Sequence, residues 1–298
     1  MGDVSDLTAV SSGQLLVGVS VSEPSDDDLI PLGLSELHVR HAFIEIVRHV
    51  LAAGWSVAYG GDFRSQGYTE ALLDLVRTYE RTTLSGPEHL TCYLAWPRWP
   101  DLTDTDRAEL ANIATVVNVA APSGAPDTLP SIADRSPEER LWNALALTAM
   151  RDRIASGLGA AVVVGGRVDG QQGLFPGVAE EAAIALAAGV PLFVAGGFGG
   201  CGRLIARALD GEEPEELSVE YQRVHTDHYP ELLAVAAAAG IPPDYSALVG
   251  ELSQRGVGGL RNRLDENENR RLLATDDADE LIALILRGLF RLAGDTHR

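Results

Sequence analysis

The 298-residue sequence contains no lysine, so all 23 of its fixed basic side chains are arginines. They stand against 43 aspartates and glutamates, and the formal net charge is −20. We do not expect diffuse nucleic-acid binding, because the chain has no excess of cations to displace counterions from a phosphate backbone. A small anionic ligand is still compatible with this charge, since helix N-termini and a few placed arginines bind phosphate even in an acidic protein.

Cysteines and long apolar runs are also scarce. Cys92 and Cys201 are too few for a disulfide framework and are expected to be free thiols. No apolar run reaches the roughly 20 residues that a membrane-spanning helix needs. Residues 1–13 are polar, lack the pattern of a secretory signal, and are predicted to form a flexible N-terminus. We therefore expect a cytoplasmic protein with no membrane partner.

What the chain does contain is an alternation of short apolar runs with segments of helical spacing. The runs are rich in valine and alanine and are too short for helices, which predicts buried strands. The predicted strands are 15–20, 55–59, 90–95, 114–120, 160–165 and 190–195, and the predicted helices between and after them are 34–53, 68–79, 136–154, 178–188 and 201–209. Buried strands alternating with helices predict a doubly wound, mostly parallel, Rossmann-like α/β sheet covered on both faces.

The remaining segments are assigned by composition. The turn-like stretch 22–28 and the stretch 96–106, which is rich in tryptophan and proline, are predicted loops. Residues 121–134 are predicted to be a connection or flap. Residues 14–209 would form the core, and residues 210–298 a helical extension packed on it, ending in an amphipathic helix at 276–293. No second domain and no internal repeat is predicted.

The stretch 165–200 is the most informative part of the chain. It contains glycines at five positions between a strand and a helix, and so much backbone freedom is costly unless something must approach closely. Glu180 and Glu181 fall in the first turn of that helix, where the helix dipole favours carboxylates whatever the function. A second glycine-rich loop, GGFGGCG, follows the next strand. A ligand site and an ordinary structural loop are both compatible with this pattern.

Other loops are expected to meet at the same edge of the sheet, because ligands of doubly wound proteins bind at the carboxyl ends of the strands. Ser20 ends the first predicted strand, and the second is followed by YGGDFRSQG. That loop could hold a ribose or a phosphate, or could be a tight turn whose aspartate caps the next helix. Arg151 and Arg153 end the helix before 160–165, either as a solvated helix end or as a clamp for phosphate.

Several familiar chemistries are not favoured. The glycine loops match neither a P-loop nor a GxGxxG dinucleotide motif, which argues against ATP hydrolysis and an ordinary NAD site. Cys201 lies at a helix start that could lower its pKa, but without a histidine partner a packing role is preferred. His225 and His228 have a metal-compatible spacing but no patterned third ligand, so a surface role is preferred. We predict no metal and no cofactor.

Taken in order, four segments resemble the SLOG superfamily, which includes the LOG phosphoribohydrolases and nucleotide-sensing domains. The segments are VGVSVSEP, AAGWSVAYGGD, MRDR and PGVAEE, and the resemblance covers about residues 14–209. The LOG motif of methionine, two residues, arginine and lysine is met by Met150 and Arg153. The motif Pro-Gly-Gly-x-Gly-Thr-x-x-Glu is met by Gly177 and Glu181. The resemblance implies that Arg153 and Glu181 are the catalytic pair.

Two departures from these motifs favour one branch of the superfamily. Ile154 replaces the lysine and Val178 replaces the threonine. With these two replacements the sequence looks more like the SLOG branch that binds ADP-ribose, cyclic ADP-ribose and similar signals. The resemblance therefore implies binding or sensing of such a molecule. The alternative is a LOG-like N-glycosidic hydrolase acting on a nucleotide. The ligand-binding residues implied are Ser20, Gly60, Gly61, Asp62, Arg64, Arg151, Gly165, Gly166, Gly177, Glu180, Gly197 and Gly199.

A homo-oligomer is expected whichever of these functions the protein has. LOG-like proteins are usually dimers, so the resemblance implies a homodimer or a higher homo-oligomer. The helical extension could supply the interface, and a structural or assembly module is the third class of function to consider. A separate effector protein could be a further partner of a sensor.

Overall fold

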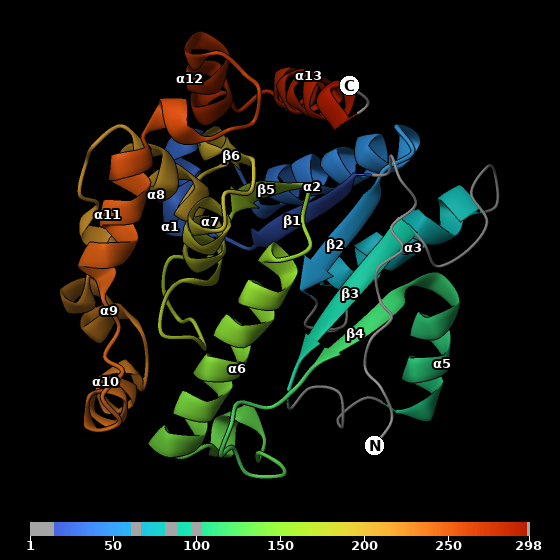
Figure 1. Ribbon diagram of the computed structural model, residues 1–298. Coiled ribbons are helices and arrows are strands. Elements are labelled where there is room, and N and C mark those ends of the chain that lie inside the picture. Colours follow the sequence, from blue (N-terminus) through green and yellow to red (C-terminus); the bar gives the residue numbers. More distant parts are fainter. Residues whose placement is uncertain (1–14, 61–66, 81–88, 97–102, 297–298) are drawn as a thin grey trace.

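The computed structural model describes residues 15–60, 67–80, 89–96 and 103–296 (Figure 1). Its centre is a six-stranded sheet in the order β4-β3-β2-β1-β5-β6, and every neighbouring pair of strands is parallel. The strands are β1 (Leu16–Ser22), β2 (Ser56–Gly60), β3 (Leu90–Ala95), β4 (Thr115–Val119), β5 (Ala160–Gly165) and β6 (Leu192–Ala195). The predicted doubly wound α/β fold is confirmed.

The apolar character of the strands follows from burial on both faces. Val17 of β1 lies beside Val57 of β2 and Ala160 of β5, and all six residues of β5 are buried. The sequences of such strands are continuous apolar runs rather than alternating patterns, because helices cover both sides of a parallel sheet.

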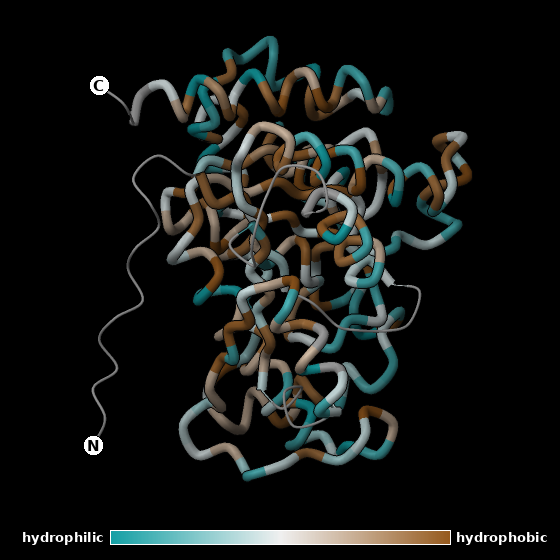
Figure 2. Tube along the Cα trace, turned by 90° about the vertical axis from the view of Figure 1, so that its right-hand side faces the viewer, coloured by the Kyte–Doolittle hydropathy of each residue, from teal (hydrophilic) through white to brown (hydrophobic). Residues whose placement is uncertain are grey.

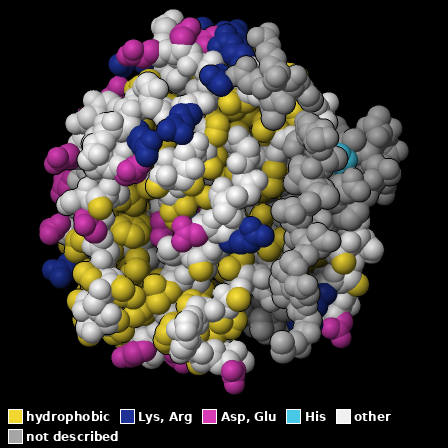
Figure 3. Space-filling model, viewed as in Figure 1, with side chains coloured by type: hydrophobic (Ala, Val, Ile, Leu, Met, Phe, Trp, Pro, Cys, Tyr) yellow, Lys and Arg dark blue, Asp and Glu magenta, His cyan; other side chains and the backbone are white. Residues whose placement is uncertain are grey.

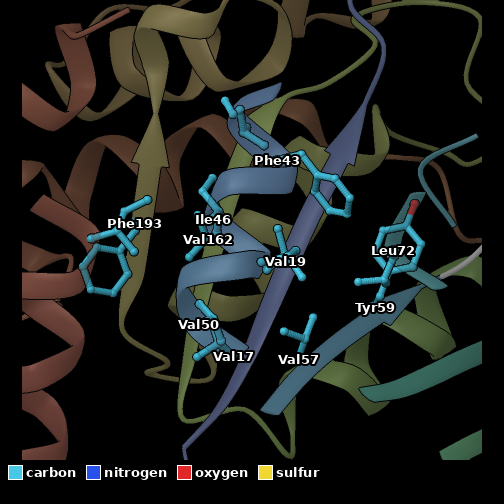
Figure 4. Packing of buried hydrophobic residues seen from close by; sticks show 14 of the residues in the cluster. Val17, Val19, Phe43, Ile46, Val50, Val57, Tyr59, Leu72, Val162 and Phe193 are labelled. Atoms are coloured by element: carbon cyan, nitrogen blue, oxygen red, sulfur yellow. The ribbon is translucent and has the colours of Figure 1, made fainter. Parts of the chain in front are cut away.

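One face of the sheet is covered by α2 (Glu36–Ala52), α3 (Tyr68–Glu80) and α5 (Asp104–Ile113), with the C-terminal helix α13 (Ala278–Thr296) packed beside α2. Phe43, Ile46 and Val50 recur at helical spacing in α2 and face the valines of the central strands (Figure 4). The other face is covered by α6 (Pro137–Ala155), α7 (Gly177–Ala187) and α8 (Gly200–Leu209).

Two short helices were missed by the sequence predictions. The predicted loop 22–28 contains α1 (Asp26–Leu29), which begins because the Ser25 and Asp28 side chains each accept a hydrogen bond from the other's backbone N–H, at 3.3 Å. Helix α5 (Asp104–Ile113) begins inside the predicted loop 96–106. Its buried side includes Leu110 and Ile113, a stripe too narrow to stand out in an otherwise polar segment.

The C-terminal extension is helical, as predicted, and shares its apolar core with β5, β6, α7 and α8. Its helices are α9 (Val219–His225), α10 (Tyr229–Ala238), α11 (Tyr245–Arg255), α12 (Glu266–Ala274) and α13. Helix α11 packs on α7 and α8, and α10 packs on α6. In Figure 1 helices α9, α10 and α11 line the left side of the molecule, and α12 and α13 lie at the top.

The same extension also covers the edge of the sheet at β6. The backbone N–H of Leu192 donates to the carbonyl oxygen of Leu260 at 2.9 Å, and the Asn262 amide donates to the carbonyl of Leu192 at 2.8 Å. These bonds satisfy backbone groups that an open edge strand would expose.

Figure 2 shows the apolar segments gathered in the interior and the polar segments on the outside. Within the described ranges, none of the helices combines the length and the apolar character required to cross a membrane.

Glu268 fastens α12 to α13 and carries a predicted pH dependence. Its carboxylate accepts hydrogen bonds from Arg291 Nη1 at 2.7 Å, from Arg287 Nη1 at 2.8 Å and from the Asp265 N–H at 2.9 Å, which lower its pKa from 4.5 to about 2. Since the folded-state pKa is the lower one, this contribution to stability is present above pH 4.5 and is lost as the pH falls toward 2.

We therefore predict that Glu268→Gln lowers the melting temperature at pH 7 by a few degrees. Melting curves of both proteins between pH 7 and pH 3 should converge as the pH falls. A difference that stays constant over this range would contradict the assignment.

Candidate functional site at the carboxyl ends of β1 and β5

The strand order places the topological switch point between β1 and β5. The chain adds β2, β3 and β4 on one side of β1, and α6 then carries it back to β5 on the other side. In open α/β sheets the crevice outside the carboxyl ends of two such strands is the usual ligand site.

The loop after β5 is anchored to the end of β1. The Gly166 N–H donates to the Ser22 carbonyl oxygen at 2.9 Å, and the Arg167 N–H donates to Ser22 Oγ at 2.8 Å. Gly165 and Gly166 have φ angles of 60° and 103°, and a Cβ on Gly166 would lie 2.8 Å from Val178. Glycine is therefore required at these positions by backbone conformation and by space.

The extension holds the rest of this loop in place. Thr226 Oγ1 accepts from the Gly170 N–H at 2.9 Å, and the Gln222 amide donates to the Val168 carbonyl oxygen at 2.9 Å. The Tyr229 hydroxyl donates to the Leu174 carbonyl oxygen at 2.5 Å, and burial raises the pKa of Tyr229 to about 12. Each of these anchors lies 54 to 56 positions beyond the loop residue that it contacts, and no local sequence signal could have identified them.

A buried ion-pair cluster joins α6 to the start of α7. The Arg151 guanidinium donates through Nη1 to Glu180, and its Nε lies 3.4 Å from Glu181 Oε1. Thr148 Oγ1 donates to the other Glu180 oxygen at 2.6 Å. Burial by itself lowers the pKa of Arg151, but Glu180 and Glu181 outweigh it and leave this pKa above its usual value. Arg151 is therefore a permanent cation neutralised from within the chain.

Gly177, the first residue of α7, makes room for this cation. A Cβ on Gly177 would lie 2.7 Å from Arg151 Nη2. Its φ is not among the positive ones, so the space occupied by Arg151 is the reason for glycine here. The guanidinium thus packs against the N-terminus of α7.

We predict that Gly177→Ala destabilises the protein by about 1–3 kcal/mol, because the guanidinium is held by two carboxylates and cannot move aside freely. Gly250→Ala on α11 is the matched control. Its Cβ would meet only the Gln254 side chain at 3.8 Å, so alanine should be neutral or stabilising by up to about 1 kcal/mol. Chemical denaturation measures both, and equal effects would contradict this role of Gly177.

Arg153 occupies a different position from the one expected of a partner of Glu181. It is exposed, and its Nη1 donates to Ser156 Oγ at 3.1 Å. Residues two apart on a helix point in directions about 200° apart, so Arg151 and Arg153 cannot face the same loop. In the structure Arg151, rather than Arg153, contacts Glu181, and a catalytic role of Arg153 and Glu181 stays a prediction.

The cleft at this position has two lobes. The first lobe, of about 210 Å³, is lined by predicted residues Gly60, Arg151, Gly177 and Glu181, together with Tyr59, Tyr68 and Trp96. The second lobe, of about 480 Å³, lies between the start of α6 and the start of α10. Both lobes are lined by Asn143, Arg167, Gly170, Gln171 and Gln172, which form the junction between them. Figure 3 shows acidic and basic side chains meeting near the middle of one face.

Ser20 lies behind the first lobe. Its buried Oγ has no hydrogen-bond partner within the described ranges. It borders a cavity of about 30 Å³ that Arg151 and Glu181 also line, with room for about one water molecule. Ser20 is thus close to the ion-pair cluster but separated from the open cleft.

The second glycine loop is explained by packing. A Cβ on Gly197 would lie 2.1 Å from the Thr275 carbonyl oxygen, and one on Gly199 would lie 3.1 Å from Leu29. The C-terminal extension thus fills the space beside Gly197, and α1 lies beside Gly199, although Gly197 and Gly199 stay predictions as binding residues. Gly61, Asp62 and Arg64 lie outside the described residues.

The thiol and imidazole candidates have other roles. Cys201 is buried, donates a hydrogen bond to the Arg167 carbonyl oxygen at 2.9 Å, and has its pKa raised by burial, which fits the preferred packing role. His225 and His228 line the second lobe. In the part of the chain that the structure describes, no three histidine, cysteine or acidic side chains cluster closely enough to hold a metal ion.

The parallel sheet and the cleft at its switch point are those of a Rossmannoid protein, and the family match relates this protein to nucleotides. A family model described as SLOG cluster2 matches residues 12–272, and the chain belongs to this SLOG family. The match includes α9, α10 and α11, the helices that hold the site loop. A search with the chain among curated proteins finds no match.

Proposed function

We propose that this protein binds or senses a nucleotide-derived molecule of the ADP-ribose or cyclic ADP-ribose type. The observation that carries the proposal is the two-lobed cleft at the switch point, with Glu181 lining one lobe and Arg167 lining the junction. A ligand that carries a ribose next to a diphosphate suits two lobes joined in this way. Carboxylates accept hydrogen bonds from ribose hydroxyls, and arginine pairs with phosphate.

Binding without hydrolysis is supported by Val178 and Arg151. Val178 takes the threonine position of the hydrolase motif, has no hydroxyl, and is 3% exposed against Gly166. Arg151 has its charge satisfied by Glu180 and Glu181, so it is not free to clamp a substrate phosphate.

The second candidate function is cleavage of a nucleotide N-glycosidic bond. The observation in its favour is that the Glu181 side chain is 28% exposed and lines the first lobe, while Glu180 is buried. A carboxylate placed in this way could stabilise an oxocarbenium-like ribose or activate water.

Isothermal titration calorimetry against ADP-ribose, cyclic ADP-ribose isomers, NAD and AMP tests the proposal. We expect binding of an ADP-ribose-type ligand and no release of free base when the mixtures are separated by chromatography. Absence of binding across the panel would refute the proposal, and base release would favour the hydrolase. Homo-oligomerisation and a separate effector protein stay predictions, which light scattering with and without ligand can examine.

A further inference from the structure

The second lobe has an arginine-rich lining that the ion-pair cluster does not use. Arg135, Arg140 and Arg167 line it, against two acidic residues, Asp169 and Asp227. This local balance is opposite in sign to the net charge of −20 for the whole chain. A cavity with such a lining attracts an anion even when the overall field repels it.

Two of these arginines have no acidic partner among the described residues. Arg140 lies in the first turn of α6 and Arg167 in the loop after β5. Among the residues that the structure describes, neither is within ion-pair distance of a carboxylate, whereas Arg151 in the neighbouring lobe contacts two. Their guanidinium donors are therefore available to a bound ligand.

The junction contributes a further free donor. Gln171 Nε2 is buried and has no hydrogen-bond acceptor within the described part of the chain, although Gln171 lines both lobes. A buried amide donor without an acceptor is costly, and a ligand oxygen would satisfy it. The two guanidinium groups and this amide nitrogen are donors, while the Gln171 amide oxygen already accepts from Thr226 Oγ1 at 3.1 Å, and such a set of donors suits a ligand rich in acceptor oxygens.

Backbone strain occurs at the opposite wall of the same lobe. His228, directly before α10, has a φ of 60°, in the left-handed region that residues other than glycine rarely adopt. Such strain clusters at ligand sites.

The start of α7 is a poor place for phosphate in this protein. The guanidinium of Arg151 fills the space beside Gly177 and is already neutralised, and Glu181 would repel an anion there. The anionic part of a ligand is thereby directed away from the first lobe.

We propose that the second lobe is a phosphate subsite, in which Arg140 and Arg167 bind the phosphoryl oxygens of a diphosphate and the Gln171 amide donates to one of them. The identity of the ligand as an ADP-ribose-type molecule rests on the proposed function. The phosphate subsite itself rests on the lining of the lobe.

The test compares Arg140→Gln and Arg167→Gln with the wild-type protein, using ADP-ribose and inorganic pyrophosphate as probes in calorimetry. Arg48→Gln is the control, because Arg48 is a surface arginine on α2 across the sheet and pairs with Glu45. We expect Arg140→Gln and Arg167→Gln each to weaken the binding of both probes by about tenfold or more. Arg48→Gln should change the affinity for neither probe. Circular dichroism confirms that the variants are folded.

The remaining outcomes separate the two proposals. If every variant binds ADP-ribose as tightly as the wild type, the phosphate subsite is wrong and the proposed function stands. If pyrophosphate binds through Arg140 and Arg167 but no nucleotide binds, the subsite stands and the proposed function fails. If the wild type binds neither ADP-ribose nor pyrophosphate, the phosphate subsite and the proposed function are both wrong.

Discussion

Replacing Arg151 with methionine is expected to lower the free energy of unfolding by about 3–5 kcal/mol. The Arg151 side chain is 9% exposed and donates to Glu180, which is itself buried, so the substitution leaves a buried carboxylate without its cation. Thr148 would then be the one remaining hydrogen-bond donor that contacts Glu180 in the described part of the chain. Urea denaturation followed by circular dichroism measures the change.

Arg153→Met is the matched control for this prediction. Arg153 lies two residues further along the same helix, is exposed, and donates a hydrogen bond to the exposed side chain of Ser156, so its loss should change stability by no more than about 0.5 kcal/mol. Equal destabilisation by both substitutions would show that the ion-pair cluster is not what holds α6 to α7.

The double variant Arg151→Met with Glu180→Leu provides the second check. Removing both charges replaces the buried pair with apolar groups, which is often neutral in free energy. It should therefore recover most of the stability lost in Arg151→Met, and Thr148 can still donate to the Ala144 carbonyl oxygen at 3.3 Å. No recovery would mean that the loss came from altered packing rather than from an unpaired charge.

Much of the fold could be predicted because its signals are local. Short apolar runs identified all six strands, and the SPEE motif identified the start of α6, where Ser136 and Glu139 form the expected capping box. Helix α5 was missed because its segment is mostly polar and starts among residues that read as a loop. A weakly amphipathic helix gives too faint a hydrophobic pattern to be predicted from the sequence.

The candidate site was only partly predictable, because motif spacing does not fix the direction of a side chain. The motif aligned Arg153 with Glu181, but the helical phase places Arg151 there instead. The sequence also did not show why each glycine of the site is needed. Gly166 is required by its positive φ, Gly177 by Arg151, and Gly197 by the backbone at Thr275, so three similar signals have three different causes.

The pair of arginines in the second lobe could not be identified from the sequence at all. Arg140 and Arg167 are 27 positions apart, and their meeting in one lobe depends on the return of the chain from β4 to β5. The strand order is a property of the whole fold, and no local pattern encodes it.

Glu181→Gln is expected to weaken binding of ADP-ribose by between about tenfold and a hundredfold, the cost of losing a charged acceptor for ribose hydroxyls. The fold should persist, because Arg151 keeps its bond to buried Glu180. Glu251→Gln is the control: Glu251 is 31% exposed, close to the 28% of Glu181, and likewise pairs with an arginine Nε, at 2.9 Å from Arg255. Calorimetry on the three proteins measures the change, and unaltered affinity in Glu181→Gln would remove Glu181 from the site.

The same pair of proteins decides between binding and catalysis. If the protein only binds its ligand, neither wild type nor Glu181→Gln releases free base from AMP or ADP-ribose, and affinity alone distinguishes them. If Glu181 stabilises an oxocarbenium-like ribose, the wild type releases base and the substitution abolishes that release while leaving ground-state binding largely intact. We expect the first pattern, because Val178 supplies no hydroxyl and both carboxylates at the start of α7 are engaged by Arg151.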